Sequence, residues 1–233
     1  MIVKEAEPYS ATANGLTAGN NQEQNVAFLL RSEFENAQFI RVINDLTISH
    51  GNESAQIDHL VIHRYGFIVI ESKGLCGEFK VDTKGEWWRC DSGRWRSMPS
   101  PVRQAELKQD LLKDFLGRHV KKFLGRILGI QMRVGGRDWQ ALCALSSNTI
   151  FHRDGMSEAI SSKIVETESL GNKVRLICSP TGGGELNGKP WFSEQEMANV
   201  SHFLLEHHRG NTPEVAREMP QSLANEQNSC VPG

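Results

Sequence analysis

The sequence lacks several features that would assign it to a specialised class of protein. Its five cysteines are widely scattered and never fall at the short spacing of a zinc ribbon or a redox pair. Its apolar runs are only a few residues long, whereas a helix that crosses a bilayer needs about 20 apolar residues. The first ten residues lack the apolar core of a secretory signal. We therefore expect a cytoplasmic protein with no membrane span.

The net charge of the whole chain is small, but basic residues are concentrated in one segment. The formal net charge is −2, and the 39% of hydrophobic and 23% of charged residues are typical of a globular protein. Residues 89–137, however, carry twelve basic and four acidic side chains, a net charge of +8, so the rest of the chain carries −10. Such segregation favours a polyanionic partner.

Tryptophans near this basic block favour nucleic acid as the partner, because aromatic rings stack on bases while cations hold phosphates. The alternatives are a solvated helix face and an amphipathic helix lying on an anionic membrane. The basic residues that we expect to contact nucleic acid are Arg94, Arg96, Arg103, Lys108, Arg118, Lys121, Lys122 and Arg126.

The hydrophobic pattern predicts one α/β domain with two less ordered ends. We expect a flexible arm at residues 1–17, a folded domain at 18–208 and a disordered tail at 209–233, where the composition is polar. The glycine-rich segment 181–188 lacks the ending of a phosphate-binding loop, so nothing indicates a nucleotide cofactor.

Periodicity and capping signals predict the elements of the domain. The expected helices are a first one capped by Asn20 or Asn21, a long one from Pro101 to Gly117, a short one at 120–128, and a last one that Ser193 and Glu196 begin with a capping box. The expected strands are 39–48, 55–63, 67–72, a hairpin at 78–90, then 139–145, 163–165 and 174–178.

Two consecutive strands bring acidic and basic side chains together. Side chains alternate along a strand, so Gln56 and Asp58 share one face, and Glu71 and Lys73 share one face of the next strand. If the strands pair through the turn at 64–66, Asp58 lies within cross-strand reach of Glu71. His59, one residue on from Asp58, then points to the opposite face.

The two carboxylates need a neutralising partner. Two carboxylates about 4 Å apart repel by roughly 4 kcal/mol at the effective dielectric of a protein surface. A divalent cation removes this repulsion, and ligands that are all oxygen favour Mg²⁺ or Mn²⁺. Lys73 offers only donors, so it would hold a water or a phosphate oxygen. The plainer alternative is an exposed ion pair between Glu71 and Lys73, worth less than about 1 kcal/mol.

The order Asp58, twelve residues, Glu71, one residue, Lys73 resembles the PD-(D/E)XK nuclease superfamily. Over about residues 15–140 the chain resembles, more narrowly, the nuclease-related domain called NERD. The residues that carry this resemblance are Glu23, the runs 44–46 and 56–59, residues 70–73, Gly77, Trp87 and the run 101–104.

The resemblance implies a restriction-endonuclease-like α/β core, with a mixed central sheet flanked by helices. It also implies metal ligands at Glu23, Asp58 and Glu71, a water-orienting role for Lys73 and a site role for Gln104. The chain departs from the pattern at Ser100, where asparagine is usual, and at Lys108, where related nucleases have tyrosine.

These observations predict a nuclease that depends on Mg²⁺ or Mn²⁺ and hydrolyses phosphodiester bonds of nucleic acid, with DNA favoured over RNA. The expected catalytic set is Asp58, Glu71 and Lys73, supported by Gln56 and Gln104, and the expected metal ligands are Glu23, Asp58 and Glu71. The alternative is a nuclease-like scaffold that binds nucleic acid or a protein without hydrolysing anything.

Overall fold

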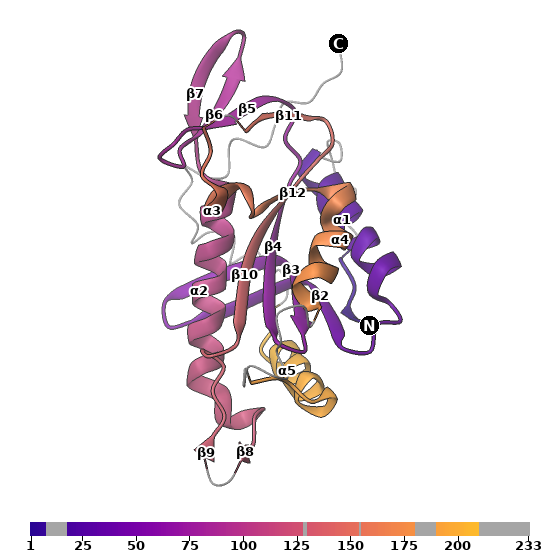
Figure 1. The fold of residues 1–233 in the computed structure, drawn as a ribbon. Coiled ribbons are helices and arrows are strands. Elements are labelled where there is room, and N and C mark those ends of the chain that lie inside the picture. The colour runs from indigo at the N-terminus through magenta and orange to yellow at the C-terminus, as the bar shows by residue number, and fades with distance from the viewer. Residues whose placement is uncertain (8–17, 128–129, 154, 180–189, 210–233) are drawn as a thin grey trace.

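A mixed β-sheet forms the centre of the molecule. The computed structural model describes residues 1–7, 18–127, 130–153, 155–179 and 190–209 (Figure 1). Within these ranges the main sheet has six strands in the order β1-β2-β3-β4-β10-β12. They are β1 (Ile2–Lys4), β2 (Ile40–His50), β3 (Glu53–His63), β4 (Gly66–Lys73), β10 (Asp138–Leu145) and β12 (Ile164–Glu166). Strands β2, β3 and β4 form an antiparallel meander, and the other neighbours pair in parallel.

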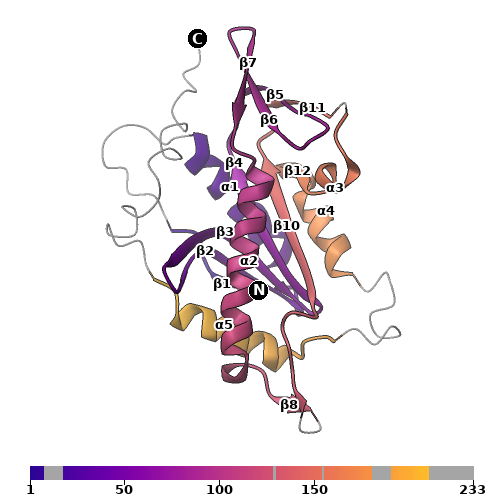
Figure 2. The same ribbon diagram turned by 90° about the vertical axis from the view of Figure 1, so that its left-hand side faces the viewer.

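Helices cover both faces of this sheet, as Figures 1 and 2 show from two directions. On one face lie α1 (Ala18–Phe34) and α4 (Thr167–Cys178), which pack with Val61, Ile68 and Ile70. On the other lie α2 (Pro101–His119) and α5 (Glu194–Glu206), which pack with the alternate residues Leu60 and Phe67 and their neighbours. Burial on both faces explains the uninterrupted apolar runs 60–62 of β3 and 67–70 of β4.

A smaller sheet stands at the end of the main sheet where α2 begins (Figure 2). Its order is β11-β5-β6-β7, from β11 (Thr149–His152), β5 (Gly77–Val81), β6 (Trp87–Asp91) and β7 (Arg94–Met98). Residues 74–76 join β4 to β5, and residues 99–100 join β7 to α2, so this sheet is tied to the ends of two elements of the core. The remaining elements are η1 (Val120–Lys122), α3 (Glu158–Ser161) and the paired β8 (Arg126–Ile127) and β9 (Ile130–Gln131).

The fold class and most of the predicted elements are confirmed. The mixed sheet flanked by helices is consistent with the restriction-endonuclease-like core that the resemblance implies. The capping box of α5 is present, because Ser193 Oγ accepts from the Glu196 N–H at 3.2 Å and the Ser193 N–H donates to the Glu196 carboxylate at 2.8 Å. No helix among the described residues is long and apolar enough to cross a membrane.

Several local expectations are wrong. Residues 174–178 are the end of helix α4, because Leu170 and Val174 form one apolar stripe against the sheet. The segment 120–128 holds only the short η1 helix before β8. Helix α2 passes Gly117 and ends at His119, and β7 was not predicted.

The two ends of the domain also differ from expectation where they are described. Ile2–Lys4 form an edge strand of the main sheet, so the flexible arm does not include these residues. Helix α1 begins at Ala18, which places Asn20 and Asn21 inside it. At the other end, the backbone N–H of Arg209 donates to the Thr47 carbonyl at 3.1 Å, so Arg209, which was assigned to the disordered tail, is bonded to β2. The rest of the expected arm (8–17), the glycine-rich segment 181–188 and the expected tail from 210 lie outside the described residues, so the domain limits stay predictions.

Candidate active site

Asp58 and Glu71 lie side by side where β3 and β4 stop pairing. His59 pairs with Ile70, so Asp58 and Glu71 are the next cross-strand neighbours. The backbone N–H of Ser72 donates to Asp58 Oδ2 at 2.8 Å, which ties the carboxylate to the end of the ladder. Both side chains are nearly buried, with 7% and 3% of their residue surface exposed. The predicted cross-strand approach of the two carboxylates is confirmed.

Lys108 of α2 is the cation that neutralises this acid pair. Its Nζ donates to Asp58 Oδ1 at 3.1 Å and makes a short contact with Glu71 Oε2. Lys73 Nζ contacts the other Glu71 oxygen, Oε1, at 2.8 Å. Two ammonium groups therefore face two carboxylates, and the cluster needs no further charge to be balanced in this structure.

The two lysines stay charged in spite of their surroundings. Burial by itself would lower the pKa of Lys73 and of Lys108, because it disfavours the charged form. For both side chains the attraction of Asp58 and Glu71 outweighs burial, so both pKa values are raised above the ordinary value. The acids and the lysines thus form one coupled charge cluster.

Glu23 on α1 is the third predicted ligand, and it is electrostatically part of the same cluster. Burial raises the pKa of Glu23 to about 8, and repulsion by Asp58 is the next cause. Lys108 opposes the shift, and Asp45 and Glu71 add to it. A carboxyl group in this position releases its proton readily only when a positive charge is added nearby.

Replacing Glu23 with glutamine should stabilise the protein in mildly alkaline solution. An unfolded glutamate titrates near pH 4.5, whereas the folded protein keeps the Glu23 proton up to about pH 8. The unfolded state binds fewer protons in this window, so the stability contributed by Glu23 falls as the pH rises from 4.5 to 8. At pH 8, the free energy of unfolding of Glu23→Gln should exceed that of wild type by at least about 1 kcal/mol, which raises Tm by a few degrees.

Thermal unfolding at pH 5 and pH 8, in the presence of a chelator, measures this effect. The exposed Glu53→Gln on β3 is the matched control and should change neither curve. A Glu23→Gln variant that is less stable than wild type at pH 8 would contradict the assigned environment of Glu23.

Asp45 on β2 is a fourth acid that the sequence reasoning did not assign. Asn44 pairs with His59 and Leu46 with Ile57, so Asp45 stands opposite Asp58 on the side away from Glu71. Its φ of +49° is left-handed, and its Oδ2 accepts the Glu7 N–H at 2.7 Å. Burial, aided by Asp58, raises the pKa of Asp45. The only signal in the sequence was its place in the run 44–46, to which no role had been attached.

His59 supports the site from the opposite face of the sheet. Its Nδ1 lies 2.8 Å from Asn44 Oδ1 and its Nε2 lies 2.9 Å from Ser72 Oγ. Burial lowers the pKa of His59 to about 3, so the ring is neutral at physiological pH. The expected orientation away from the acids is confirmed, and His59 fixes the two strands that carry them.

The two predicted glutamines are not brought into the charge cluster. Gln56 lies two residues before Asp58 on β3 and is exposed, and Gln104 lies one helical turn before Lys108 on α2. Neither side chain makes a hydrogen bond to another described residue. Their roles stay predictions, and the side chain that α2 does place on the acids is Lys108, which sequence reasoning had grouped with the nucleic-acid contacts.

The other predicted nucleic-acid contacts fall into two groups. Arg94 and Arg96 on β7 and Arg103 in the first turn of α2 are exposed, and they lie on the strand that leads into α2 and at the start of that helix. The second group lies at the other end of α2, which is 19 residues or about 28 Å long. It consists of the exposed Arg118, Lys121 and Lys122, followed by Arg126, whose side chain is outside the described part.

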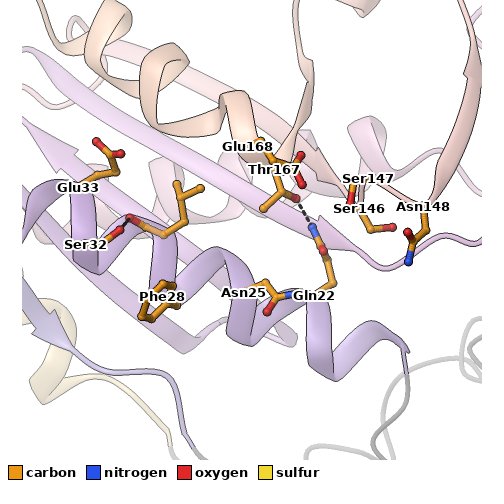
Figure 3. Close-up of a pocket in the computed structure, with 11 residues that line it drawn as sticks. Gln22, Asn25, Phe28, Ser32, Glu33, Ser146, Ser147, Asn148, Thr167 and Glu168 are labelled. Atoms are coloured by element: carbon orange, nitrogen blue, oxygen red, sulfur yellow. Dashed lines mark hydrogen bonds between the residues drawn. The ribbon is translucent and has the colours of Figure 1, made fainter.

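A separate pocket of about 380 Å³ lies on the other side of the sheet end, between α1 and the start of α4 (Figure 3). Gln22, Asn25 and Phe28 line it from α1, and Ser146 and Thr167 are among the residues opposite them. No lysine or arginine lines it, and none of the predicted site residues does. Its chemistry does not suit a phosphate, so it is not the candidate active site.

The residues of the acid pair fit a cation held by oxygen ligands. One oxygen of Asp58 and one of Glu71 converge on a single point, which Lys108 Nζ takes in this structure. Two nearly buried carboxylates aimed at one point match the ligand chemistry of Mg²⁺ or Mn²⁺. The described residues contain no group of three or more His, Cys, Asp or Glu arranged to hold a metal ion, so the two carboxylates are the ligands that this structure brings together.

Comparison with known protein families finds a match, and it covers the segment that carries this site. Residues 18–131 match the model of a family described as nuclease-related domain, NERD. No curated protein and no solved structure matches the chain significantly. The matched segment runs from α1 through β9, so it contains all three predicted ligands as well as Lys73 and Lys108, while β10, α4 and α5 lie beyond it.

Proposed function

We propose, from the premise that residues 18–131 match the model of the nuclease-related domain family, that this protein is a metal-dependent nuclease. It hydrolyses phosphodiester bonds of nucleic acid, with DNA as the favoured substrate and Mg²⁺ or Mn²⁺ as the cofactor. The observation that carries the proposal is the convergence of the Asp58 and Glu71 carboxylates on one cation-sized point, with Lys73 beside them.

Asp58 and Glu71 would hold the metal ion, and Glu23 would complete the ligand set. When bound, the ion supplies a water of lowered pKa and neutralises charge on the scissile phosphate. Addition of a divalent charge also favours loss of the proton that burial keeps on Glu23. Metal binding would therefore be coupled to release of the Glu23 proton, and the metal affinity would rise with pH.

Lys73 would orient the attacking water or a phosphate oxygen. Its ammonium is held by Glu71 Oε1 at 2.8 Å and is about one quarter exposed, so it faces both the acid and the solvent from which substrate arrives. An ammonium has three donors, so one bond to Glu71 leaves others for the substrate. Gln56 and Gln104, at the margins of the site, would support the bound substrate.

The exposed arginines of β7 and of the first turn of α2 would hold the nucleic-acid backbone. Each phosphate contact contributes about 0.9 to the slope of the logarithm of affinity against the logarithm of salt concentration for duplex DNA. Replacing Arg94 and Arg96 together with alanine should therefore reduce that slope by about 1.8 and weaken binding at every sequence tested. Fluorescence anisotropy of a labelled duplex between 50 and 200 mM salt, with a chelator to prevent cleavage, is the measurement.

A control for charge alone is the pair Arg31→Ala and Lys173→Ala, on α1 and α4. It removes the same charge from the opposite side of the main sheet and should leave the salt slope unchanged. Equal slopes for all three proteins would show that β7 does not contact the backbone.

Cleavage of plasmid and linear DNA tests the proposed activity directly. Purified protein should cut DNA with Mg²⁺ or Mn²⁺ and not with EDTA, and Asp58→Ala should be inactive under all three conditions. The proposal fails if neither metal supports cleavage, or if Asp58→Ala cuts as fast as wild type.

One observation favours the alternative of a binding module without activity. Lys108 already balances the acid pair, so the fold does not need a metal ion to be stable. Calorimetry with Mn²⁺ separates the two functions, because the nuclease requires binding heat that disappears in Glu71→Ala. Saturable DNA binding without any metal signal would favour the module.

A further inference from the structure

Lys108 occupies the point at which the acid pair would hold a metal ion, and we infer that it is an internal counter-ion that the metal must displace. The strength of the Lys108 contacts then sets the metal affinity of the site. This inference rests on the proposed function, because it takes Mg²⁺ or Mn²⁺ as the cation that competes with the lysine.

The geometry leaves no room for both cations. Lys108 Nζ contacts one oxygen of Asp58 and one of Glu71, so it bridges the two carboxylates. A metal ion bound by the same oxygens must stand at the same point, because Mg²⁺ holds its ligands at about 2.0–2.1 Å. Two positive charges at this separation also repel. Binding of the metal therefore requires that the ammonium leave.

The Lys108 ammonium, and not that of Lys73, occupies the point at which the metal ion would bind. Among the described residues Lys73 pairs with Glu71 Oε1, which leaves Asp58 Oδ1 and Glu71 Oε2 to the cation that stands between them. Lys108 comes from helix α2, and 20% of its side chain is exposed, so its stem reaches the acids from the solvent side of the cluster. A lysine is a point charge on a flexible stem, in contrast to the planar fork of an arginine.

The same contacts explain what Lys108 does before metal binds. Asp58 and Glu71 are nearly buried and would repel one another if they were left without a cation. Lys108 removes that repulsion, so the site is assembled before metal arrives. The stabilisation is lost when the metal enters, and this loss lowers the observed metal affinity.

Calorimetric titration of the full chain with Mn²⁺ tests the inference. Lys108→Met removes the competing charge and keeps most of the stem, so Mn²⁺ should bind at least about tenfold more tightly than to wild type. The control is Lys84→Met, an exposed lysine between β5 and β6, which should bind Mn²⁺ as wild type does. Circular dichroism of each protein verifies that it is folded.

A second variant decides the question if Lys108→Met does not fold. Lys108→Arg keeps the charge and offers two parallel hydrogen bonds to the acids, so it is harder to displace and should weaken Mn²⁺ binding by about tenfold. Equal Mn²⁺ affinity in wild type and in the folded Lys108 variants would overturn the inference alone. Absence of binding heat in every protein would overturn the metal site, and with it both the inference and the proposed function.

Discussion

Replacing Glu71 with glutamine should reduce DNA cleavage by at least about 100-fold. Glu71 contacts both lysines of the cluster, one with each oxygen, and is nearly buried. The amide keeps the shape of the side chain but loses its charge and one of its acceptor oxygens. It therefore holds a divalent ion and the Lys73 ammonium much more weakly than the carboxylate does, because the attraction between opposite charges is lost. The measurement is the initial rate of cleavage at saturating Mn²⁺ on linear and supercoiled DNA.

The control for this substitution is Glu78→Gln on β5, the next strand along the chain, which belongs to the smaller sheet. Glu78 pairs with His152 near the protein surface and does not contact the acid pair. It should cleave at the wild-type rate, and both variants should unfold in a single transition. If Glu71→Gln retained a rate within about threefold of wild type, Glu71 would not be a metal ligand.

Replacing Gly66 with alanine should have the largest effect on stability. Gly66 begins β4 and lies between His63 on β3 and Asp138 on β10. A Cβ atom at this position would overlap the backbone carbonyl of Asp138, so β4 and β10 would have to separate. We expect a loss of about 3 kcal/mol or more in the free energy of unfolding, and a fall in Tm of about 6–12 °C.

Gly117→Ala is the control, because it should raise the free energy of unfolding where Gly66→Ala lowers it. Gly117 lies within helix α2, and no atom stands within 4 Å of a Cβ built there. Alanine favours the helix over glycine by up to about 1 kcal/mol, so this variant should be slightly more stable than wild type. Urea unfolding of the two variants gives both values. A Gly66→Ala variant within about 0.5 kcal/mol of wild type would show that the two strands do not approach as described.

Much of the fold followed from the sequence because strands buried on both faces and an amphipathic helix leave strong patterns. The apolar run before Glu71 and the stripe of α2 are of this kind, and both elements were predicted. Residues 174–178 were misassigned because a short apolar run fits a strand as well as a buried helical turn. The edge strand Ile2–Lys4 was missed because its order depends on pairing with β2, nearly 40 residues away.

The site was predictable only where local geometry determines it. One hairpin turn and the alternation of side chains suffice to place Asp58, Glu71 and Lys73 together. Glu23 was identified from the family resemblance alone. The contact of Lys108 with Glu71 joins residues 37 positions apart and depends on how α2 packs on the sheet. The charge pattern of the sequence predicted that Lys108 contacts phosphates of nucleic acid, whereas in the structure it contacts Asp58 and Glu71.

Diffraction from crystals soaked in Mn²⁺ tests the central claim most directly, because manganese is located by its anomalous scattering. The account predicts a manganese ion bound by the carboxylates of Asp58 and Glu71, with Glu23 turned towards it and the Lys108 ammonium displaced towards solvent. A saturating soak that leaves no manganese at this position, with Lys108 still bridging Asp58 and Glu71, would contradict it.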